Sequence, residues 1–307
     1  MRLLLLGCTG LVGRALVPLL AQAGHDLVVV SRRPLAPAAG RLLQCDGLDP
    51  AAWGSDGPLA AAVAAAEGVV NLTGEPIAEK RWTPAHRALL RASRVEVTQR
   101  LAAAITAAPV PPQVLVSGSA VGYYGTSADG CFDEDSPCGD DFLAGLCRDW
   151  EAAAQTVPPA CRVVRLRTGI VLAPEGGALG RMLPIFRTGL GGPVGDGRQW
   201  MSWIDRSDLC AVIAEALANS AWDGPLNGTA PNPVTMAEFC ATLGRVLARP
   251  SLLPVPAPVL QLLLGDGARV VLEGQRVLPR RLQSLGFGFR YPELSAALAA
   301  ATSPGHR

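Results

Sequence analysis

Residues 3–13 read LLLLGCTGLVG, and this stretch decides the fold. Leu3–Leu6 is a short, continuous apolar run of the kind that forms a buried parallel strand. The apolar residues that follow, at 11, 12, 15, 16, 19 and 20, have helical spacing, and Gly24 suits the end of that helix. The next apolar run, Leu27–Val30, predicts a second strand. The order of strand, glycine loop, helix and strand therefore predicts a βαβ unit.

The loop at residues 7–13 has the spacing GxxGxxG and stands between the predicted strand and the predicted helix. Glycines permit a tight turn and let backbone N–H groups approach a pyrophosphate at the positive end of the helix. The pattern alone is weak in a chain with 34 glycines, but its position makes it a specific signal. We therefore expect a dinucleotide on this loop, held by Gly7, Thr9, Gly10, Leu11, Val12 and Gly13.

The end of the second predicted strand indicates which dinucleotide. It reads Val30-Ser31-Arg32-Arg33, with no acidic residue at its tip. Folds that select NAD place Asp or Glu there to hold the ribose 2′-hydroxyl, whereas a guanidinium can hold a 2′-phosphate bidentately. Ser31, Arg32 and Arg33 therefore favour NADP(H), and the alternative is a solvated basic turn.

Further apolar runs continue the alternation of strands and helices and predict an α/β fold with a doubly wound parallel sheet, the Rossmann type. After about residue 170, glycine-rich loops interrupt the regular alternation of strands and helices. We expect a NADP-binding domain over residues 1–170, to which later segments return, and a smaller substrate lobe over 171–307 that includes a helical domain at about 250–300. The predicted strands are 42–45, 68–72, 114–117 and 163–166; the predicted helices are 58–66, 84–107, 143–155, 206–218 and 235–248, with a linker at 250–258.

The fourth predicted strand ends in Asn71-Leu72-Thr73-Gly74, at the edge where open α/β sheets bind ligands. A small residue and a glycine there let the backbone pass close to the adenosine side of a dinucleotide. Leu72, Thr73 and Gly74 are therefore predicted to contact the cofactor, as is Ser117 at the end of the fifth strand. Asp46 and Gly47, after the third strand, are candidates for flanking the adenine.

The composition and net charge limit the classes of binding partner to be expected. The chain has 307 residues, of which 17% are charged, and a formal net charge of +1, so nothing indicates nucleic acid or a membrane surface as a partner. The apolar run before Cys8 has four residues, whereas a secretory signal needs roughly 7–15. We therefore expect a cytoplasmic protein. Without a secretory signal, the eight cysteines, which include no CxxC pair, are expected to be mostly reduced. The cysteines and three histidines show no metal-ligand spacing, and no metal is expected.

Several longer motifs resemble one family. They are GEPI at 74–77 with KRW at 80–82, ASR at 92–94, SGSAVGYYG at 117–125, RTGIVL at 167–172, GLGGP at 189–193 and GQRVLP at 274–279. Together with the glycine loop they resemble the extended (atypical) short-chain dehydrogenase/reductases. More specifically, the chain is similar over its whole length to the NADP-binding "epimerase family" proteins, labelled nucleoside-diphosphate-sugar epimerases, including their small C-terminal domain. The resemblance implies that Ser31, Arg32, Leu72, Thr73 and Arg94 contact NADP(H).

Short-chain dehydrogenases use a Ser or Thr at the end of strand five and a Tyr-x-x-x-Lys pair on the next helix, where the lysine lowers the pKa of the tyrosine. By this resemblance Ser119 is the serine, whose hydroxyl can polarise a carbonyl. The pair itself is missing. One register puts Phe142 and Leu146 at the two positions, and the other puts Leu143 and Cys147 there.

Three replacements for the missing pair stay open. Tyr123 or Tyr124 is a candidate proton donor, Arg148 or Lys80 is a candidate positive charge, and Cys147 is a candidate titrating group. The alternative for the tyrosines is that both pack against the edge of the sheet. Ser119, Tyr123 and Tyr124 are therefore the predicted catalytic residues.

The segment 199–208, QWMSWIDRSD, carries Asp205 where the relatives usually have a histidine, and we expect Asp205 to cap the following helix. Met182, Arg187, Gln199 and Trp203 are the predicted substrate contacts. The sequence thus favours an NADP(H)-dependent oxidoreductase or epimerase that acts on a small molecule with a hydroxyl or carbonyl group, a nucleotide sugar being one candidate. The alternative is a non-catalytic, NADP(H)-binding redox sensor.

Overall fold

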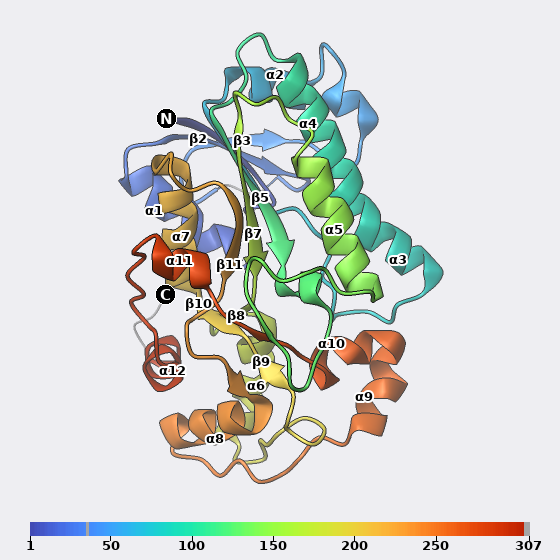
Figure 1. Cartoon of the computed structure of the whole chain (residues 1–307), viewed down its shortest axis with the longest axis vertical. Coiled ribbons are helices and arrows are strands. Elements are labelled where there is room, and N and C mark those ends of the chain that lie inside the picture. Colours follow the sequence, from blue (N-terminus) through green and yellow to red (C-terminus); the bar gives the residue numbers. More distant parts are fainter. Residues whose placement is uncertain (35–36, 304–307) are drawn as a thin grey trace.

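A single parallel sheet of seven strands forms the centre of the computed structural model, which describes residues 1–34 and 37–303 (Figure 1). The strand order is β11-β7-β5-β4-β1-β2-β3. The order reverses between β1 and β4, which makes their carboxyl ends the topological switch point where such sheets bind ligands. This confirms the predicted Rossmann fold. The strands are β1 (Arg2–Leu6), β2 (Asp26–Ser31), β3 (Arg41–Gln44), β4 (Gly68–Asn71), β5 (Val114–Ala120), β7 (Arg162–Thr168) and β11 (Gly224–Gly228).

Helices cover both faces of this sheet, which explains why its strands read as uninterrupted apolar runs. Successive side chains of a strand point to opposite faces. Leu3 and Leu5 therefore pack with α1 (Gly13–Gln22) and α7 (Arg206–Ala218), whereas Leu4 and Leu6 pack on the other side. That second layer contains α2 (Pro58–Ala65), α4 (Val97–Ala107) and α5 (Phe142–Ala154). Each fully buried leucine stabilises the fold by about 1.5–3 kcal/mol.

The segment predicted as one helix over 84–107 is interrupted. It consists of α3 (Pro84–Arg91), a π-helical segment η2 (Ala92–Glu96) and α4. Thr83 begins α3 by accepting a hydrogen bond from the His86 backbone N–H at 3.2 Å. The wider π turn changes which face its side chains occupy, and such turns are frequent at functional sites. Arg94 lies in this turn.

The chain after residue 170 divides between two places. Helix α7, strand β11 and helix α11 (Arg280–Ser284) return to the sheet, where Leu282 is buried in the same core as α1 and α7. A second core joins α6 (Gly177–Arg187), α8 (Met236–Leu247) and α12 (Leu294–Thr302), below the sheet in Figure 1. The domain boundary at residue 170 stays a prediction.

Short elements complete the fold; of these, only the helical pieces after residue 256 fall in a region that we predicted to be helical. Three small sheets pair β8 (Ile170–Leu172) with β10 (Trp203–Asp205), β9 (Trp200–Met201) with β12 (Val234–Thr235), and β6 (Cys131–Phe132) with β13 (Arg276–Val277). The remaining helical pieces are η1 (Pro50–Trp53), η3 (Val121–Tyr124), α9 (Ala257–Leu264), η4 (Gly265–Ala268) and α10 (Arg269–Leu272). Within the described ranges, no helix has the length and apolar character needed to span a membrane.

Candidate functional site

Two neighbouring pockets open where the strands of the sheet end. The first, which we call the glycine-loop pocket, has a volume of about 220 Å³, and the second, the α5 pocket, has a volume of about 280 Å³. Among the predicted cofactor residues, those that line the glycine-loop pocket come from the ends of β1, β2 and β4. They are Gly7, Thr9, Gly10, Ser31, Arg32, Leu72, Thr73 and Gly74, together with Asp46 and Gly47.

The three glycines of the loop serve three different purposes. Gly7 has φ +72°, and a side chain on it would lie 2.4 Å from the Leu72 carbonyl carbon at the end of β4. Gly10 faces open space, where a Cβ would meet only the Gly7 carbonyl oxygen at 3.7 Å. Gly13 begins α1, and a Cβ there would lie 2.1 Å from the Cys8 carbonyl oxygen. The loop thus turns tightly, leaves room for a ligand at Gly10 and seats the positive end of α1 against the strand.

The end of β2 presents a free cation to this pocket. Arg32 is exposed and lines the glycine-loop pocket, and it forms no ion pair with any residue that the structure describes. Ser31 is buried, and its Oγ accepts a hydrogen bond from the Arg33 backbone N–H at 3.1 Å. Arg32 is therefore available to an anionic ligand, whereas Arg33 is exposed outside the pocket lining.

The other predicted cofactor residues lie outside the glycine-loop pocket. The Leu11 side chain packs toward Gly176 and Gly177, and the Val12 carbonyl accepts a hydrogen bond from the Cys210 thiol at 3.7 Å. Ser117 is buried within β5 and lines neither pocket. Together with Gly13, these residues shape the loop and the strands around it.

Arg94 stands between the two pockets. It is buried, lines the α5 pocket, and donates hydrogen bonds to the carbonyl oxygens of Glu75 at 2.9 Å and Leu90 at 3.3 Å. Its guanidinium lies against the ring of Trp150 and occupies the space where Gly74 has no side chain. Burial lowers the pKa of Arg94. A Cβ at Gly74 would lie 2.9 Å from the guanidinium carbon, so a side chain there would require Arg94 to shift.

A buried hydrogen-bond network holds the end of β4 in place beside Arg94. Asn71 Nδ2 donates to Thr98 Oγ1 on α4 at 2.9 Å, and the Trp150 indole N–H donates to the same oxygen at 3.0 Å. Asn71 Oδ1 accepts from the Thr73 hydroxyl at 2.6 Å and from its backbone N–H at 3.2 Å. The network orients Thr73 at the wall of the glycine-loop pocket.

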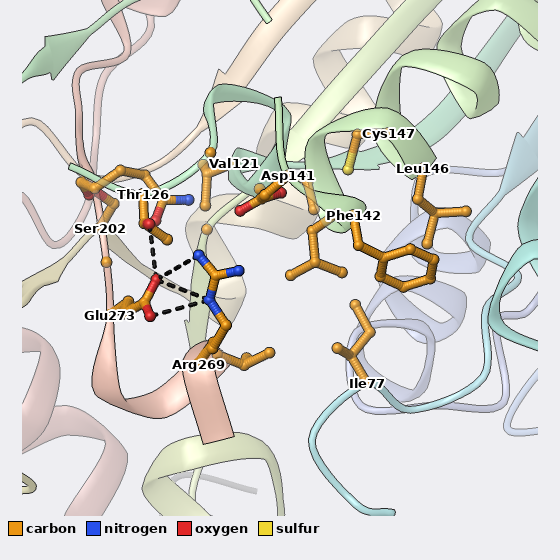
Figure 2. A pocket seen from close by; sticks show the side chains of 18 of the residues that line it. Ile77, Val121, Thr126, Asp141, Phe142, Leu146, Cys147, Ser202, Arg269 and Glu273 are labelled. Atoms are coloured by element: carbon orange, nitrogen blue, oxygen red, sulfur yellow. Dashed lines mark hydrogen bonds and ion pairs between the residues drawn. The ribbon is translucent and has the colours of Figure 1, made fainter. Parts of the chain in front are cut away.

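The α5 pocket contains the positions where short-chain dehydrogenases carry their Tyr-x-x-x-Lys pair. Phe142, Leu143, Leu146 and Cys147 all line it, so both alignment registers place apolar groups there. Leu143 and Cys147 share one face of α5 with Glu151, because residues four apart lie above one another on a helix. Figure 2 shows Phe142, Leu146 and Ile77 facing the cavity opposite Arg269 and Glu273.

Ser119, at the end of β5, and Thr168, at the end of β7, are polar side chains of the sheet that reach this pocket. Ser119 is buried, and its hydroxyl donates to Glu151 Oε1 at 2.7 Å. Glu151 in turn accepts from Arg167 Nε at 2.8 Å and Nη2 at 3.0 Å, and from Arg165 at 3.4 Å. A carboxylate held by two guanidinium groups can only accept hydrogen bonds. The Ser119 proton is therefore directed at Glu151, and the catalytic role of Ser119 stays a prediction.

The two tyrosines lie on η3, and both contact Arg167. Tyr124 is buried; its hydroxyl donates to Asn227 Oδ1 at 2.7 Å and accepts from Arg167 Nη1 at 2.9 Å. Burial raises the pKa of Tyr124 to about 12. The ring of Tyr123 lies 3.6 Å from the Arg167 guanidinium carbon. Neither tyrosine lines the α5 pocket, so the geometry favours the packing interpretation over a proton donor.

The other candidate replacements are also placed unfavourably. Burial raises the pKa of the Cys147 thiol to about 12, and neighbouring Glu151 adds to this shift. Lys80 pairs with Glu75 at 3.1 Å, and Arg148 contacts the adjacent Asp149 at 3.3 Å; both cations are largely exposed and neither lines the pocket. Cys147 is thus held as the neutral thiol, and the two cations lie outside the pocket.

The predicted substrate residues are not gathered at the α5 pocket. Trp203 is fully buried in the core between α6 and α8, and its indole N–H donates to the Asn232 carbonyl at 3.0 Å. Gln199 donates to the carbonyls of Val194 and Val271, while Met182 and Arg187 lie on α6. None of the four lines either pocket. Asp205 caps α7 by accepting from the Ser207 backbone N–H at 2.7 Å, as predicted.

Sequence reasoning missed Glu151 and Arg167. The sequence did contain a signal for Arg167. The predicted strand at 163–166 carries Arg165 and continues into Arg167, and a charged residue in a buried strand needs a partner of opposite charge. Their partner, Glu151, lies on α5 at the helical spacing set by Leu143 and Cys147. The walls that Trp200, Arg269, Val270 and Glu273 contribute come from distant segments and had no such signal.

The fold and the two pockets define a Rossmann-type protein of the short-chain dehydrogenase/reductase class. The model of the NAD dependent epimerase/dehydratase family matches residues 3–226, and a domain of unknown function, DUF1731, matches residues 255–301. The chain belongs to the NAD dependent epimerase/dehydratase family.

Individual relatives match over the whole chain. The chain is 45% identical to the epimerase family protein SDR39U1 homolog, chloroplastic, of Arabidopsis thaliana, covering 96% of this chain and 84% of the relative. It is similar to the crystal structure of human epimerase family protein SDR39U1 with NADPH, at 42% identity, a TM-score of 0.88 and coverage of 97% and 98%. It also resembles the nucleoside-diphosphate sugar epimerase of Corynebacterium glutamicum, at 34% identity and a TM-score of 0.75, covering 97% of this chain and 57% of that one.

Proposed function

We propose that the chain is an NADP(H)-dependent oxidoreductase or epimerase that acts on a small molecule with a hydroxyl or carbonyl group. The observation that carries this proposal is the adjacency of the two pockets: Gly74 lines one, Arg94 lines the other, and the two residues touch. One pocket has the features of a dinucleotide site, and the other presents Ser119. The human relative crystallised with NADPH, at 42% identity, supports the choice of cofactor.

The residues of the glycine-loop pocket fit NADP(H). Gly10 leaves open the space that a pyrophosphate needs, and α1 directs its positive end at that space. Arg32, which forms no ion pair with a described residue, offers its guanidinium at the end of β2, where a 2′-phosphate would be held. Thr73, oriented by Asn71, closes the pocket from β4.

When bound, NADP(H) would supply hydride transfer at its nicotinamide. The protein's own residues would bind and orient the reacting molecule in the α5 pocket. Ser119 is the residue proposed to contact its hydroxyl or carbonyl group, and Glu151 with Arg167 fixes the direction of the Ser119 hydroxyl. The apolar side chains of α5 would exclude water from the reacting carbon.

The test offers the purified protein NADPH with a panel of carbonyl compounds, and NADP⁺ with the matching alcohols and nucleotide sugars, while absorbance of the reduced nicotinamide is followed. We expect turnover with at least one pair and a loss of about 10- to 100-fold in kcat/KM for Ser119→Ala. Transfer of deuterium from deuterated NADPH to the product would identify the reaction directly.

A second candidate is a non-catalytic NADP(H)-binding redox sensor. The observation that favours it is the apolar lining at Phe142, Leu143, Leu146 and Cys147, where the catalytic pair of an active enzyme would stand. Tight binding that distinguishes NADPH from NADP⁺, without turnover on any compound of the panel, would support this candidate and contradict the enzyme.

A further inference from the structure

Most of the polar side chains around the α5 pocket already form hydrogen bonds within the protein. Arg269 and Glu273 pair with each other at 3.0 Å, and Glu273 also accepts from the Thr126 hydroxyl at 2.9 Å (Figure 2). Asp141 accepts from the Ala144 backbone N–H and caps α5, while the Ser202 hydroxyl donates to the Gln275 carbonyl. Among the described lining residues, the Gln275 side chain forms no hydrogen bond, and Arg269 Nη1 and Asp141 Oδ2 also have no hydrogen-bond partner.

The indole N–H groups of the tryptophans that line the pocket also form hydrogen bonds within the protein. The indole N–H of Trp82 donates to the Ile77 carbonyl, that of Trp150 to Thr98, and that of Trp200 to the Ala128 carbonyl. These residues therefore offer the cavity mainly apolar surface. A sugar would place several hydroxyl groups against this surface, and burial of a hydroxyl without a hydrogen-bond partner is unfavourable.

Ser119 gives this mainly apolar cavity a polar contact of fixed direction. Its proton is taken by Glu151 at 2.7 Å, and no donor within the described residues occupies the remaining lone pairs of Oγ. Glu151 cannot return the proton in a hydrogen bond, because Arg167 holds both of its oxygens. Toward the pocket, Ser119 Oγ is therefore a hydrogen-bond acceptor that matches a hydroxyl group and mismatches a carbonyl oxygen.

We propose that the α5 pocket binds an apolar alcohol of aromatic size, whose hydroxyl donates to Ser119 Oγ, and that it does not bind the sugar of a nucleotide sugar. The inference rests on the proposed function in taking this pocket as the place of the reacting molecule. It narrows the substrate class to an apolar alcohol, with the matching ketone as the weaker-binding partner. The cavity volume of about 280 Å³ accommodates a single substituted ring.

Calorimetric titration of the full chain without added cofactor tests the binding preference independently of any turnover. The probes are each enantiomer of 1-phenylethanol, acetophenone, ethylbenzene and UDP-glucose. We expect the better enantiomer of the alcohol to bind about fivefold more tightly than acetophenone, since one neutral hydrogen bond separates them. Ser119→Ala should remove this preference and leave the affinity for ethylbenzene unchanged, whereas the exposed Ser284→Ala should preserve it.

Leu143→Trp locates the site, because it fills the cavity from α5 and should abolish binding of the alcohol. Three results would overturn the inference: acetophenone binding as tightly as the alcohol, alcohol binding unaffected by Leu143→Trp, or UDP-glucose binding more tightly than the alcohol. A fivefold alcohol preference without any NADP⁺-linked oxidation would support this inference and contradict the proposed function.

Discussion

At the scale of single residues, the most informative group is the buried set around Arg167. Ser119, Glu151, Arg167 and Tyr124 form a continuous chain of hydrogen bonds from the α5 pocket into the interior. A buried charge pair is costly unless all of its partners are satisfied, and here each carboxylate oxygen has a guanidinium donor. These hydrogen bonds therefore fix the orientation of the Ser119 hydroxyl, and this orientation decides which chemical group the pocket accepts.

The two tyrosines should separate a structural role from a catalytic one. Tyr124→Phe removes the hydroxyl that contacts Asn227 and Arg167, and we expect it to reduce the free energy of unfolding by about 1–3 kcal/mol. Tyr123→Phe keeps the ring that stacks on Arg167 and is the matched control, with a change within about 0.5 kcal/mol. Chemical denaturation measures both. Equal stability of the two variants would contradict the assignment of Tyr124 to the buried network.

Cys147 should behave as an inert core thiol. Burial raises its pKa to about 12, so it is the neutral thiol at every pH well below that value. At pH 8 only about one molecule in ten thousand would carry the reactive thiolate. We expect iodoacetamide to label the exposed Cys131 at pH 8 and to spare Cys147 in the native protein, as read by mass spectrometry of peptides. Labelling of Cys147 at the rate of Cys131 would restore it as a titrating candidate.

At the scale of elements, the glycine loop shows how sequence spacing becomes a binding site. Gly13→Ala places a methyl group 2.1 Å from the Cys8 carbonyl oxygen, and we expect a loss of about 1–3 kcal/mol in the free energy of unfolding. Gly10→Ala meets only open space, so stability should be unchanged while affinity for NADPH falls about tenfold. Thermal unfolding and NADPH titration of both variants check this. A stable Gly13→Ala protein, or a Gly10→Ala protein with full affinity, would contradict it.

The main elements of the sheet were predictable because their signals are local. The apolar runs of β1, β2, β4 and β5 and the helical spacing of α1 are set by burial on one or both faces, and all were confirmed. The short strands β8 and β10 depend on pairing between segments more than thirty residues apart, which no local pattern encodes. The same pairing places Trp203 in the core. Because this pairing could not be predicted from the sequence, we wrongly expected Trp203 in the substrate cleft.

The glycine-loop pocket was also readable from the sequence, because its residues sit at strand ends that a parallel sheet brings to one edge. Residues 7, 10, 32 and 73 meet there. The α5 pocket was readable only in part. Ser119 was predicted to be catalytic and the four positions on α5 were aligned with the missing Tyr-x-x-x-Lys pair, but Arg269 and Glu273 arrive from the DUF1731 region by tertiary packing alone.

At the scale of the whole molecule, the C-terminal region is built into the Rossmann part. Glu134 accepts hydrogen bonds from the backbone N–H groups of Asn227 on β11 and Arg281 on α11, and β13 pairs with β6. Leu282 is fully buried in the core beneath the sheet. These contacts tie residues after 270 to the sheet and complete the α5 pocket at the same time.

The full chain should therefore unfold as one cooperative unit. Scanning calorimetry is expected to show a single transition with equal calorimetric and van't Hoff enthalpies. The physical reason is that separation of the C-terminal segments from the sheet would expose the core around Leu282 to water. Two separate transitions would contradict this account and would indicate an independent C-terminal domain.

The central claim is that the glycine-loop pocket binds NADP(H) with Arg32 on the 2′-phosphate. The most direct measurement is the Kd for NADPH and for NADH in the wild type and in Arg32→Ala. The control is Arg41→Ala, which removes an exposed arginine at the amino end of β3, away from the strand ends that line the pocket. We predict that the wild type prefers NADPH and that Arg32→Ala weakens NADPH binding about 10- to 100-fold, with NADH unchanged and the control unaffected. Equal losses for the two cofactors, or a wild type that binds them equally, would contradict the claim.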